Sequence, residues 1–360
     1  MRMKKKIVAI NGESFCRTLT GIERLAVEVV KYLDGMVHPG QMELIVPENA
    51  KNLPELNNIS IVTIPVEANF FPKWTQIFYQ KYCLTKNRYS FNFSNTCPFF
   101  CPGFEFIHDI FSYLYPQDFK GSKRDRLIHL YSNIMYKAIA KRAKEIFTVS
   151  EYTKQTIIKA YGTNPKKINV VYSGVSGYNN VQEDFGIFEK LPILKEREFY
   201  FTLGSLSTRK NFKWIVQHAK KYPDELFAVS GKPLPSVVPP ELEDLKNLDN
   251  VIMLGYLSDE EVKAIYSKCK AFLLPTYFEG FGLPPLEALS SGAKVIVSNV
   301  TSLPEIYGDC AYYIDPDKPE VDLAELLKEP VASPDSILRK YTLQNTAARI
   351  YDILKPYLKD

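Results

Sequence analysis

Two glutamates, Glu279 and Glu287, lie eight positions apart in the stretch YFEGFGLPPLEAL, residues 277–289. Each carboxylate has two oxygens that accept hydrogen bonds, so a pair of them suits a ligand rich in hydroxyl groups. We expect Glu287 to accept from a ribose cis-diol and Glu279 to reach the hydroxyls of a sugar. The alternative is a plain turn followed by an amphipathic helix with a favourable acidic first turn.

The backbone between the two glutamates is suited to phosphate. Gly280 and Gly282 allow backbone amides to approach a ligand closely, because glycine has no side chain. Pro284 or Pro285 is expected to start a helix, with Glu287 in its first turn, and the positive end of a helix favours a phosphate. The stretch therefore predicts a pocket for a ligand that carries both hydroxyls and phosphate.

Two further loops follow predicted strands. In LGSLSTRKN, residues 203–211, Gly204 turns the chain, and Arg209 with Lys210 places two cations that could neutralise a departing pyrophosphate. In IHDIFSYLYP, residues 107–116, His108 ends an apolar strand and could bind a sugar hydroxyl or position an acceptor. The alternatives are a solvated Arg-Lys surface pair and a histidine with a purely structural hydrogen bond.

These loops need strands and helices to hold them, and the sequence alternates the two almost throughout. Several predicted strands, such as KIVAI and MELIVP, are continuous apolar runs, as expected of strands covered on both faces. The alternation occurs once in each half, which predicts two doubly wound parallel α/β domains. The least patterned stretch, 174–198, marks the junction, and Ser258 with Glu261 has the spacing of a helix-starting capping box.

Composition limits the class of protein. The 360 residues are 46% apolar and 24% charged, which is typical of a globular protein with room for two domains. No apolar run approaches the roughly 18 residues of a spanning helix. The basic start is followed by only four apolar residues, which predicts a buried first strand and no signal peptide. The six scattered cysteines form no zinc-like set, so we expect free thiols in a reducing cytoplasm.

The motifs together resemble the retaining glycosyltransferases of the GT-B fold, and within them family 4, the glycosyltransferase group 1 enzymes. The Glu-x7-Glu signature is present as Glu279 and Glu287 within EGFGLPPLEALSSGAKVIVSN. Nearly the whole chain resembles the family in order, through TGIERLA (20–26), IHDIFSYLYP, FTVSEYTKQTI (147–157), VVYSGV (170–175), GSLSTRKN and SLPEIYGDCAYYIDP (302–316). The resemblance implies two Rossmann-like domains facing across a cleft: an acceptor-side domain, 1–178, a nucleotide-sugar domain, 179–341, and a last helix, 342–360, that crosses back to the first.

The resemblance also implies roles for the donor-side residues. Glu287 would hold the ribose and Glu279 the transferred sugar, while Arg209 and Lys210 would hold the diphosphate beside Gly204. The backbone amides of the loop would contact the sugar and its phosphates, at Gly280, Phe281, Gly282 and Leu283.

On the acceptor side, His108 would sit beside the sugar, and Gly21 would let its loop approach the donor phosphates. Two positions depart from the family pattern. Ser205 stands where an arginine often follows the glycine, and Leu343 where a tryptophan often begins the last helix. The first departure makes phosphate binding depend more on Arg209 and Lys210.

The expected reaction moves a sugar from a nucleotide-diphosphate donor to an acceptor hydroxyl with retention, and it uses no metal or other cofactor. Domain closure would exclude water from the site. A non-catalytic GT-B scaffold or partner subunit is one alternative, although Glu279, Glu287 and Lys210 are all present. A nucleotide-sugar epimerase would need no acceptor, and a phosphorylase would carry pyridoxal and a longer chain.

Charge suggests where the acceptor comes from. Residues 1–170 hold 24 Lys/Arg against 14 Asp/Glu, whereas residues 171–360 hold 21 against 27. Between 120 and 145, eight basic residues are interleaved with apolar ones against two acidic residues. Such a helix could lie on an anionic membrane, or simply expose a solvated basic face. We expect a lipid-linked saccharide acceptor, in O-antigen, capsule or exopolysaccharide synthesis, and a cytoplasmic protein that is peripheral at the inner face of the membrane. No motif indicates nucleic-acid binding.

Overall fold

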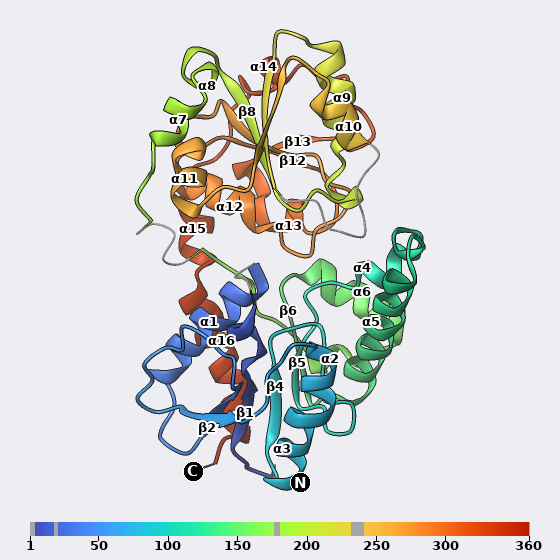
Figure 1. Ribbon diagram of the computed structural model, residues 1–360, viewed down its shortest axis with the longest axis vertical. Coiled ribbons are helices and arrows are strands. Elements are labelled where there is room, and N and C mark those ends of the chain that lie inside the picture. Colours follow the sequence, from blue (N-terminus) through green and yellow to red (C-terminus); the bar gives the residue numbers. More distant parts are fainter. Residues whose placement is uncertain (1–3, 18–20, 176–180, 232–240, 360) are drawn as a thin grey trace. The chain divides into compact units, whose positions relative to one another are not determined.

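The computed structural model describes residues 4–17, 21–175, 181–231 and 241–359 of the chain, which fall into two compact units (Figure 1). The first unit comprises Met1–Leu114, Leu127–Ser173 and Tyr341–Asp360, and the second comprises Tyr115–Arg126 and Gly174–Lys340. The domain boundary predicted between 178 and 179 lies outside the described residues. Each unit is a parallel sheet covered by helices.

The sheet of the first unit has seven strands, all parallel, in the order β3-β2-β1-β4-β5-β6-β7. The strands are β1 (Val8–Asn11), β2 (Met42–Pro47), β3 (Ser60–Ile64), β4 (Tyr89–Asn92), β5 (Phe104–Phe106), β6 (Glu145–Thr148) and β7 (Ile168–Val170). Every residue of β1, β2, β4 and β5 is buried, as the continuous apolar runs predict. The chain order reverses between β1 and β4, so the carboxyl ends of these two strands flank the switch point of the sheet.

Helices cover both faces of this sheet, with α1 and α16 on one side and α2 and α5 on the other (Figure 1). They are α1 (Gly21–Asp34), α2 (Phe71–Lys73), a π-helical segment (Trp74–Tyr79), α3 (Gln80–Thr85), α4 (Phe111–Leu114), α5 (Lys123–Arg142), α6 (Glu151–Tyr161) and α16 (Leu343–Leu354). The last of these packs against α1. Residues 341–360 therefore return to the first unit after the chain has built the second.

The second unit has six parallel strands in the order β10-β9-β8-β11-β12-β13. They are β8 (Phe199–Leu203), β9 (Leu226–Ser230), β10 (Val251–Gly255), β11 (Ala271–Leu274), β12 (Val295–Ser298) and β13 (Tyr312–Ile314). Counted along the unit, this is the order 3-2-1-4-5-6 of the Rossmann fold, with its switch point between β8 and β11. The prediction of two Rossmann-like parallel α/β domains is confirmed.

The helices of the second unit alternate with these strands, and Figure 1 shows α9 and α10 on one side of the sheet and α11 and α12 on the other. They are α7 (Gly186–Lys190), α8 (Ile193–Glu196), α9 (Phe212–Lys221), α10 (Glu241–Lys246), α11 (Asp259–Lys268), α12 (Leu283–Ser290), α13 (Leu303–Tyr307), α14 (Leu323–Leu326) and α15 (Asp335–Lys340). The predicted capping box is present, since Ser258 accepts from the amide of Glu261 and the Glu261 side chain accepts from the amide of Ser258. In the part of the chain that the structure describes, no helix combines the length and the apolar character needed to cross a membrane.

Candidate active site

Two loops meet at the switch point of the second unit, where ligands bind in open α/β sheets. One follows β8 and carries Gly204, Arg209 and Lys210, and the other follows β11 and carries Glu279. Because β8 and β11 are hydrogen-bonded neighbours, their carboxyl ends lie side by side. The topology therefore brings together two loops that are far apart in the sequence.

A buried ion pair joins these loops. Lys210 Nζ lies 2.7 Å from Glu279 Oε1, and both side chains are only 8% exposed. Gly204 makes room for the lysine, because a Cβ built there would lie 3.0 Å from Lys210 Cε. From the sequence we expected Lys210 to bind the diphosphate and Glu279 to bind the sugar. We did not predict that the two side chains would form an ion pair.

Glu279 is ionised despite its burial. Burial by itself raises the pKa of a carboxyl, but the charges of Lys210 and Arg209 and the hydrogen bond from Lys210 outweigh it. The net effect is a pKa below the usual glutamate value. The site thus holds a fixed negative charge beside fixed positive charges at neutral pH.

Short hydrogen bonds hold both loops in place. The Thr276 hydroxyl donates to the carbonyl oxygen of Arg209 over 2.6 Å, and the amide of Tyr277 donates to the same oxygen. The Asn211 side-chain amide donates to the carbonyl oxygens of Pro275 at 2.8 Å and Pro316 at 2.9 Å. Asn211 adopts the left-handed conformation with φ 56°, which asparagine tolerates better than most residues. Thr276 and Asn211 are positioning residues that the sequence interpretation missed, although Asn211 is the last residue of LGSLSTRKN and Thr276 directly precedes YFEGFGLPPLEAL.

The glycine-containing loop ends in α12, and one prediction here is wrong. Gly282 has φ 84° and stands at the N-cap position, so the helix begins at Leu283 and not at Pro284 or Pro285. Glu287 consequently lies in the second turn of the helix, half-buried, and not in the first turn. The left-handed glycine makes the difference, because it lets the chain enter the helix before the two prolines.

Backbone contacts fix the rest of the glycine-containing loop. The amide of Glu279 donates to Thr301 Oγ1 at 3.2 Å, and the Ser302 hydroxyl donates to the carbonyl oxygen of Glu279 at 3.1 Å. The Tyr307 hydroxyl donates to the carbonyl oxygen of Gly282. Among the remaining predicted residues, Gly280 and Phe281 are buried and Leu283 is half-buried.

Two predicted residues belong to the first unit. His108 follows β5 and is 8% exposed, and its Nε2 donates to the carbonyl oxygen of Phe93 at 2.5 Å. Burial lowers the pKa of His108, partly offset by that hydrogen bond and by the charges of Asp109 and Glu23. The ring is therefore neutral at pH 7, with Nδ1 as its acceptor atom. Gly21 is exposed and is the first residue of α1.

No group of three or more metal-ligating His, Cys, Asp or Glu side chains occurs among the described residues. All six cysteines are free thiols. The arrangement in the second unit offers two cations, one buried carboxylate and the backbone amides of residues 280–283, in the loop that enters α12. These groups can neutralise a diphosphate and bind hydroxyl groups at the same place.

Comparison with known proteins identifies the family to which these features correspond. The family described as Glycosyl transferases group 1 matches residues 184–348, and Glycosyltransferase Family 4 matches residues 19–176. The O-antigen chain mannosyltransferase RfbU of Salmonella typhimurium is 31% identical over 237 residues, which are 65% of this chain and 62% of that protein. The serotype-specific mannosyltransferase WbdA of Escherichia coli is 31% identical over 219 residues, 56% of this chain but only 26% of WbdA.

Solved structures share the fold over the whole chain. Anabaena HepE in complex with UDP and glucose has a TM-score of 0.68 at 15% identity, covering 98% of this chain and 99% of HepE. WaaG, a glycosyltransferase involved in lipopolysaccharide biosynthesis, has a TM-score of 0.65 at 16% identity, covering 98% and 96%. At these identities the likeness establishes the two-domain GT-B architecture.

Proposed function

This chain belongs to the group 1 glycosyltransferases, and we propose that it transfers a mannosyl group from a nucleoside-diphosphate donor to a saccharide acceptor of an O-antigen-type polysaccharide. The buried Lys210–Glu279 pair at the switch point of the second unit carries the proposal, because it places a cation for phosphate against a carboxylate for sugar hydroxyls. The choice of mannose rests on the relatives RfbU and WbdA, which are mannosyltransferases.

In the proposed reaction, the protein binds the two substrates and stabilises the charge of the leaving group. The acceptor hydroxyl oxygen bonds to the anomeric carbon while the bond from that carbon to the diphosphate oxygen breaks. The departing diphosphate oxygen takes the hydroxyl proton, so the new bond forms on the same face and the configuration is retained. Arg209, Lys210 and the amides of residues 280–283 stabilise the charge that develops on the diphosphate, without a metal ion. Glu279 and Glu287 orient the sugar and the ribose.

A transfer assay tests this proposal. Purified protein is incubated with GDP-, UDP- and dTDP-sugars and with mannose-terminated oligosaccharides, with magnesium or with EDTA. We expect one mannose donor to extend the acceptor in EDTA, with a product of retained anomeric configuration by NMR. Conversion of the donor without an acceptor would indicate an epimerase. No conversion at all would favour a non-catalytic scaffold, and an inverted product would exclude the proposed mechanism.

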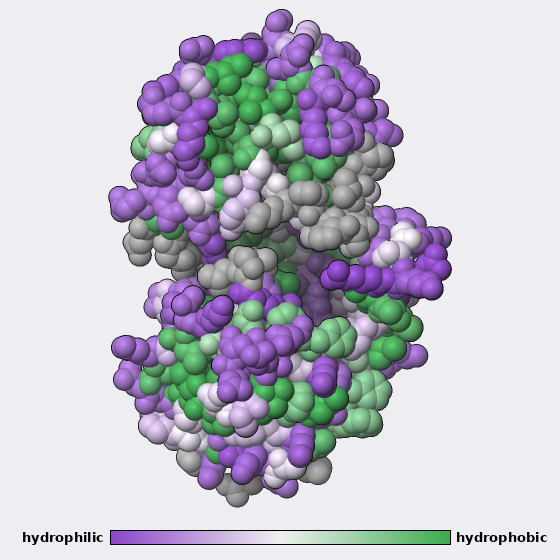
Figure 2. All heavy atoms as spheres, viewed as in Figure 1, coloured by the Kyte–Doolittle hydropathy of each residue, from purple (hydrophilic) through white to green (hydrophobic). Residues whose placement is uncertain are grey.

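We further propose that the acceptor is lipid-linked and that α5 brings the protein to an anionic membrane surface. Leu127, Leu130 and Ile134 recur at helical spacing and are 65%, 56% and 44% exposed. Lys123 and Lys137, both exposed, share this stripe by the same period. In Figure 2, apolar side chains lie beside hydrophilic ones on the surface over α5. If α5 served only to expose basic residues to water, its apolar side chains would be expected to lie buried against the protein. On a membrane surface, the exposed apolar side chains would be covered by lipid.

Vesicle co-sedimentation tests the membrane proposal. The wild-type protein should bind vesicles that contain phosphatidylglycerol and should not bind pure phosphatidylcholine, and high salt should weaken the binding. Leu127→Ser with Leu130→Ser should abolish it. The matched control is Leu84→Ser, which changes an apolar side chain that is 54% exposed on α3. Equal binding by wild type and the α5 variant would contradict the proposal.

A further inference from the structure

A third loop lies beside the glycine-containing loop of the second unit. It follows β12, which is the hydrogen-bonded neighbour of β11. The carboxyl ends of these two strands share the edge of the sheet where Lys210 and Glu279 pair. Thr301 and Ser302 stand in this loop, directly before α13. The reaction proposed above gives neither of them a part.

Thr301 has an unfavourable backbone conformation. Its φ of 55° lies in the left-handed region, where Cβ crowds the following carbonyl oxygen, and a β-branched residue is rarely found there. Within the ranges that the structure describes, the other non-glycine residues with positive φ are all asparagines, at positions 52, 87 and 211. Glycine or asparagine would relieve the strain at position 301. A threonine in this conformation therefore indicates that its own side chain is needed.

The side chains of Thr301 and Ser302 both bind the main chain of Glu279. Thr301 Oγ1 accepts from the amide of Glu279 at 3.2 Å, and the Ser302 hydroxyl donates to the carbonyl oxygen of Glu279 at 3.1 Å. Ser302 is also the N-cap residue of α13, where a serine usually accepts from an amide of its own helix, but its side chain makes no such bond. The two hydroxyls thus serve the neighbouring loop and not their own.

The loop that they hold needs anchors because of its glycines. Glu279 directly precedes Gly280, and glycine has more backbone freedom than any other residue. The two hydroxyls anchor the chain before the glycines, and the Tyr307 hydroxyl anchors it after them, by donating to the carbonyl oxygen of Gly282. A glutamate carboxylate moves with its own main chain. The place of the Glu279 carboxylate therefore depends on the anchor at its backbone.

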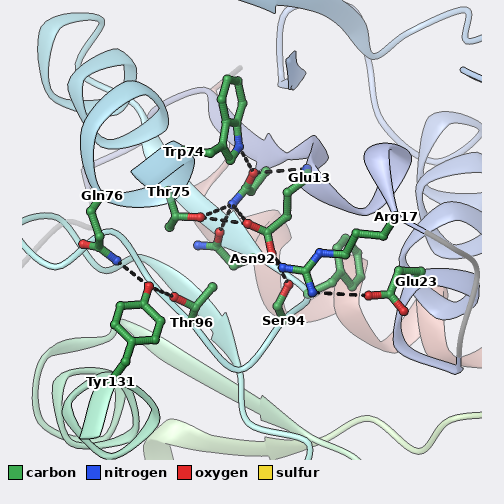
Figure 3. A network of polar contacts seen from close by, with 12 residues as sticks. Glu13, Arg17, Glu23, Trp74, Thr75, Gln76, Asn92, Ser94, Thr96 and Tyr131 are labelled. Atoms are coloured by element: carbon green, nitrogen blue, oxygen red, sulfur yellow. Dashed lines mark hydrogen bonds and ion pairs between the residues drawn. The ribbon is translucent and has the colours of Figure 1, made fainter. Parts of the chain in front are cut away.

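A buried glutamate of the first unit is held in a different way. The carboxylate oxygens of Glu13 accept hydrogen bonds from Arg17, Thr75 and Ser94, each over 2.8 Å (Figure 3). These bonds occupy the carboxylate itself. The hydroxyls that anchor Glu279 bind its main chain and use neither of its carboxylate oxygens, which suits a carboxylate that binds a ligand.

We propose that Thr301 is a positioning residue for sugar transfer, whose hydroxyl fixes the main chain of Glu279 so that the carboxylate meets the transferred sugar. Ser302 acts with it on the carbonyl side. The strained backbone of Thr301 lowers the stability of the fold and keeps the hydroxyl where the reaction needs it. The inference rests on the proposed function, because it assigns positioning residues to that same site.

The variant Thr301→Val tests the role of the hydroxyl, because it keeps the branched shape and removes the oxygen. We expect kcat to fall about tenfold, the effect of losing one hydrogen bond. The affinity for the nucleoside diphosphate should stay unchanged, because Glu279 meets the sugar. Thr301→Ser keeps the hydroxyl and should keep kcat near the wild-type value. The matched control is Thr342→Val, which removes a hydroxyl that accepts from the amide of Asn345 at 3.1 Å and should leave kcat unchanged.

The strain gives a second readout, with a sign that a merely structural role would not produce. Thr301→Gly lacks the hydroxyl, as Thr301→Val does, but glycine adopts the left-handed conformation freely. Its midpoint in urea should therefore lie above that of Thr301→Val, although glycine is less stable than valine at most positions. Its kcat should be as low as that of Thr301→Val. A residue that served stability alone would make the midpoint and kcat change together.

Hydrogen exchange followed by mass spectrometry needs no turnover. A peptide that covers residues 277–289 should exchange faster in Thr301→Val than in wild type, and at the wild-type rate in Thr342→Val. If wild type transfers no sugar but shows this exchange pattern, the proposed function alone is contradicted. Unchanged exchange in Thr301→Val would overturn this inference. So would a wild-type kcat in that variant, or a loss of nucleoside-diphosphate affinity as large as the loss in kcat.

Discussion

At the scale of single residues, the second unit depends on an ion pair that is costly to break. Lys210 and Glu279 are both almost fully buried, so each compensates a charge that would otherwise be stranded away from water. The pair is also the part of the site that contacts ligand in our proposal. A donor that binds here must therefore exchange contacts with an existing pair, and it is this pair that keeps Glu279 ionised before the donor arrives.

The acid sensitivity of Glu279 follows from its lowered pKa. A carboxyl whose folded pKa is depressed stabilises the protein above its unfolded pKa, and that contribution is lost as pH falls through the folded pKa. We therefore expect the difference in free energy of unfolding between wild type and Glu279→Gln to be constant from pH 8 to pH 5. It should shrink below the ordinary glutamate value of 4.5. Urea denaturation at a series of pH values measures this difference. If the difference in free energy of unfolding already decreases between pH 7 and pH 5, the pKa of Glu279 is not lowered.

The sequence predicted most residues of the candidate site but not how they pair. Gly204, Arg209, Lys210 and Glu279 could be placed in loops because each loop follows an apolar run that had to be a buried strand. The contact between positions 210 and 279 could not be predicted, because it depends on β8 and β11 being neighbours in the sheet. The hydrogen bonds of Glu13 with Thr75 and Ser94 were missed for the same reason, since each joins residues more than 60 positions apart.

At the scale of elements, the start of α12 shows where sequence rules were insufficient. The preference of proline for the first position of a helix predicted that the helix begins at Pro284 or Pro285. In the structure Gly282 adopts the left-handed conformation, and the helix begins at Leu283. The capping box at Ser258 was predicted because all of its determinants are local. The π-helical turns at Trp74–Tyr79 had no local signal.

Substituting Gly282 tests how strictly α12 is positioned. Gly282→Ala should lower donor affinity strongly, because its Cβ would lie 2.6 Å from Leu303 Cδ2 and φ is 84°. The matched control is Gly292→Ala, at φ 83° with no atom within 4 Å of the added Cβ. Both variants should lose about 1 kcal/mol to backbone strain, but only Gly282→Ala should weaken the donor in calorimetric titration. Equal donor affinity in the two variants would show that the loop adapts freely.

At the scale of the whole molecule, the chain carries one tryptophan in each unit. Trp74 is 1% exposed in the first unit and Trp214 is 1% exposed in the second, so fluorescence can follow the two units separately. The return of residues 341–360 to the first unit gives a specific expectation. The C-terminal helix α16 should stabilise the first unit, although the second unit precedes it in the chain.

Ile350→Ala tests whether α16 stabilises the first unit and not the second. Ile350 is fully buried in α16, which packs against α1, and its truncation should cost about 2–5 kcal/mol of unfolding free energy. The loss should appear in the Trp74 signal, recorded in a Trp214→Phe background. The Trp214 signal, recorded in a Trp74→Phe background, should keep its wild-type midpoint. A matching shift in both signals would show that the two units unfold together.

Calorimetric titration with GDP-, UDP- and dTDP-mannose, in magnesium and in EDTA, tests whether the switch point of the second unit binds the donor. We expect one of the three to bind wild type, equally well in EDTA. Lys210→Ala should lose most of the affinity for the nucleoside diphosphate, while the weak affinity for the free nucleoside should be unchanged. If Lys210→Ala binds the nucleoside diphosphate as tightly as wild type does, the switch point of the second unit is not the donor site.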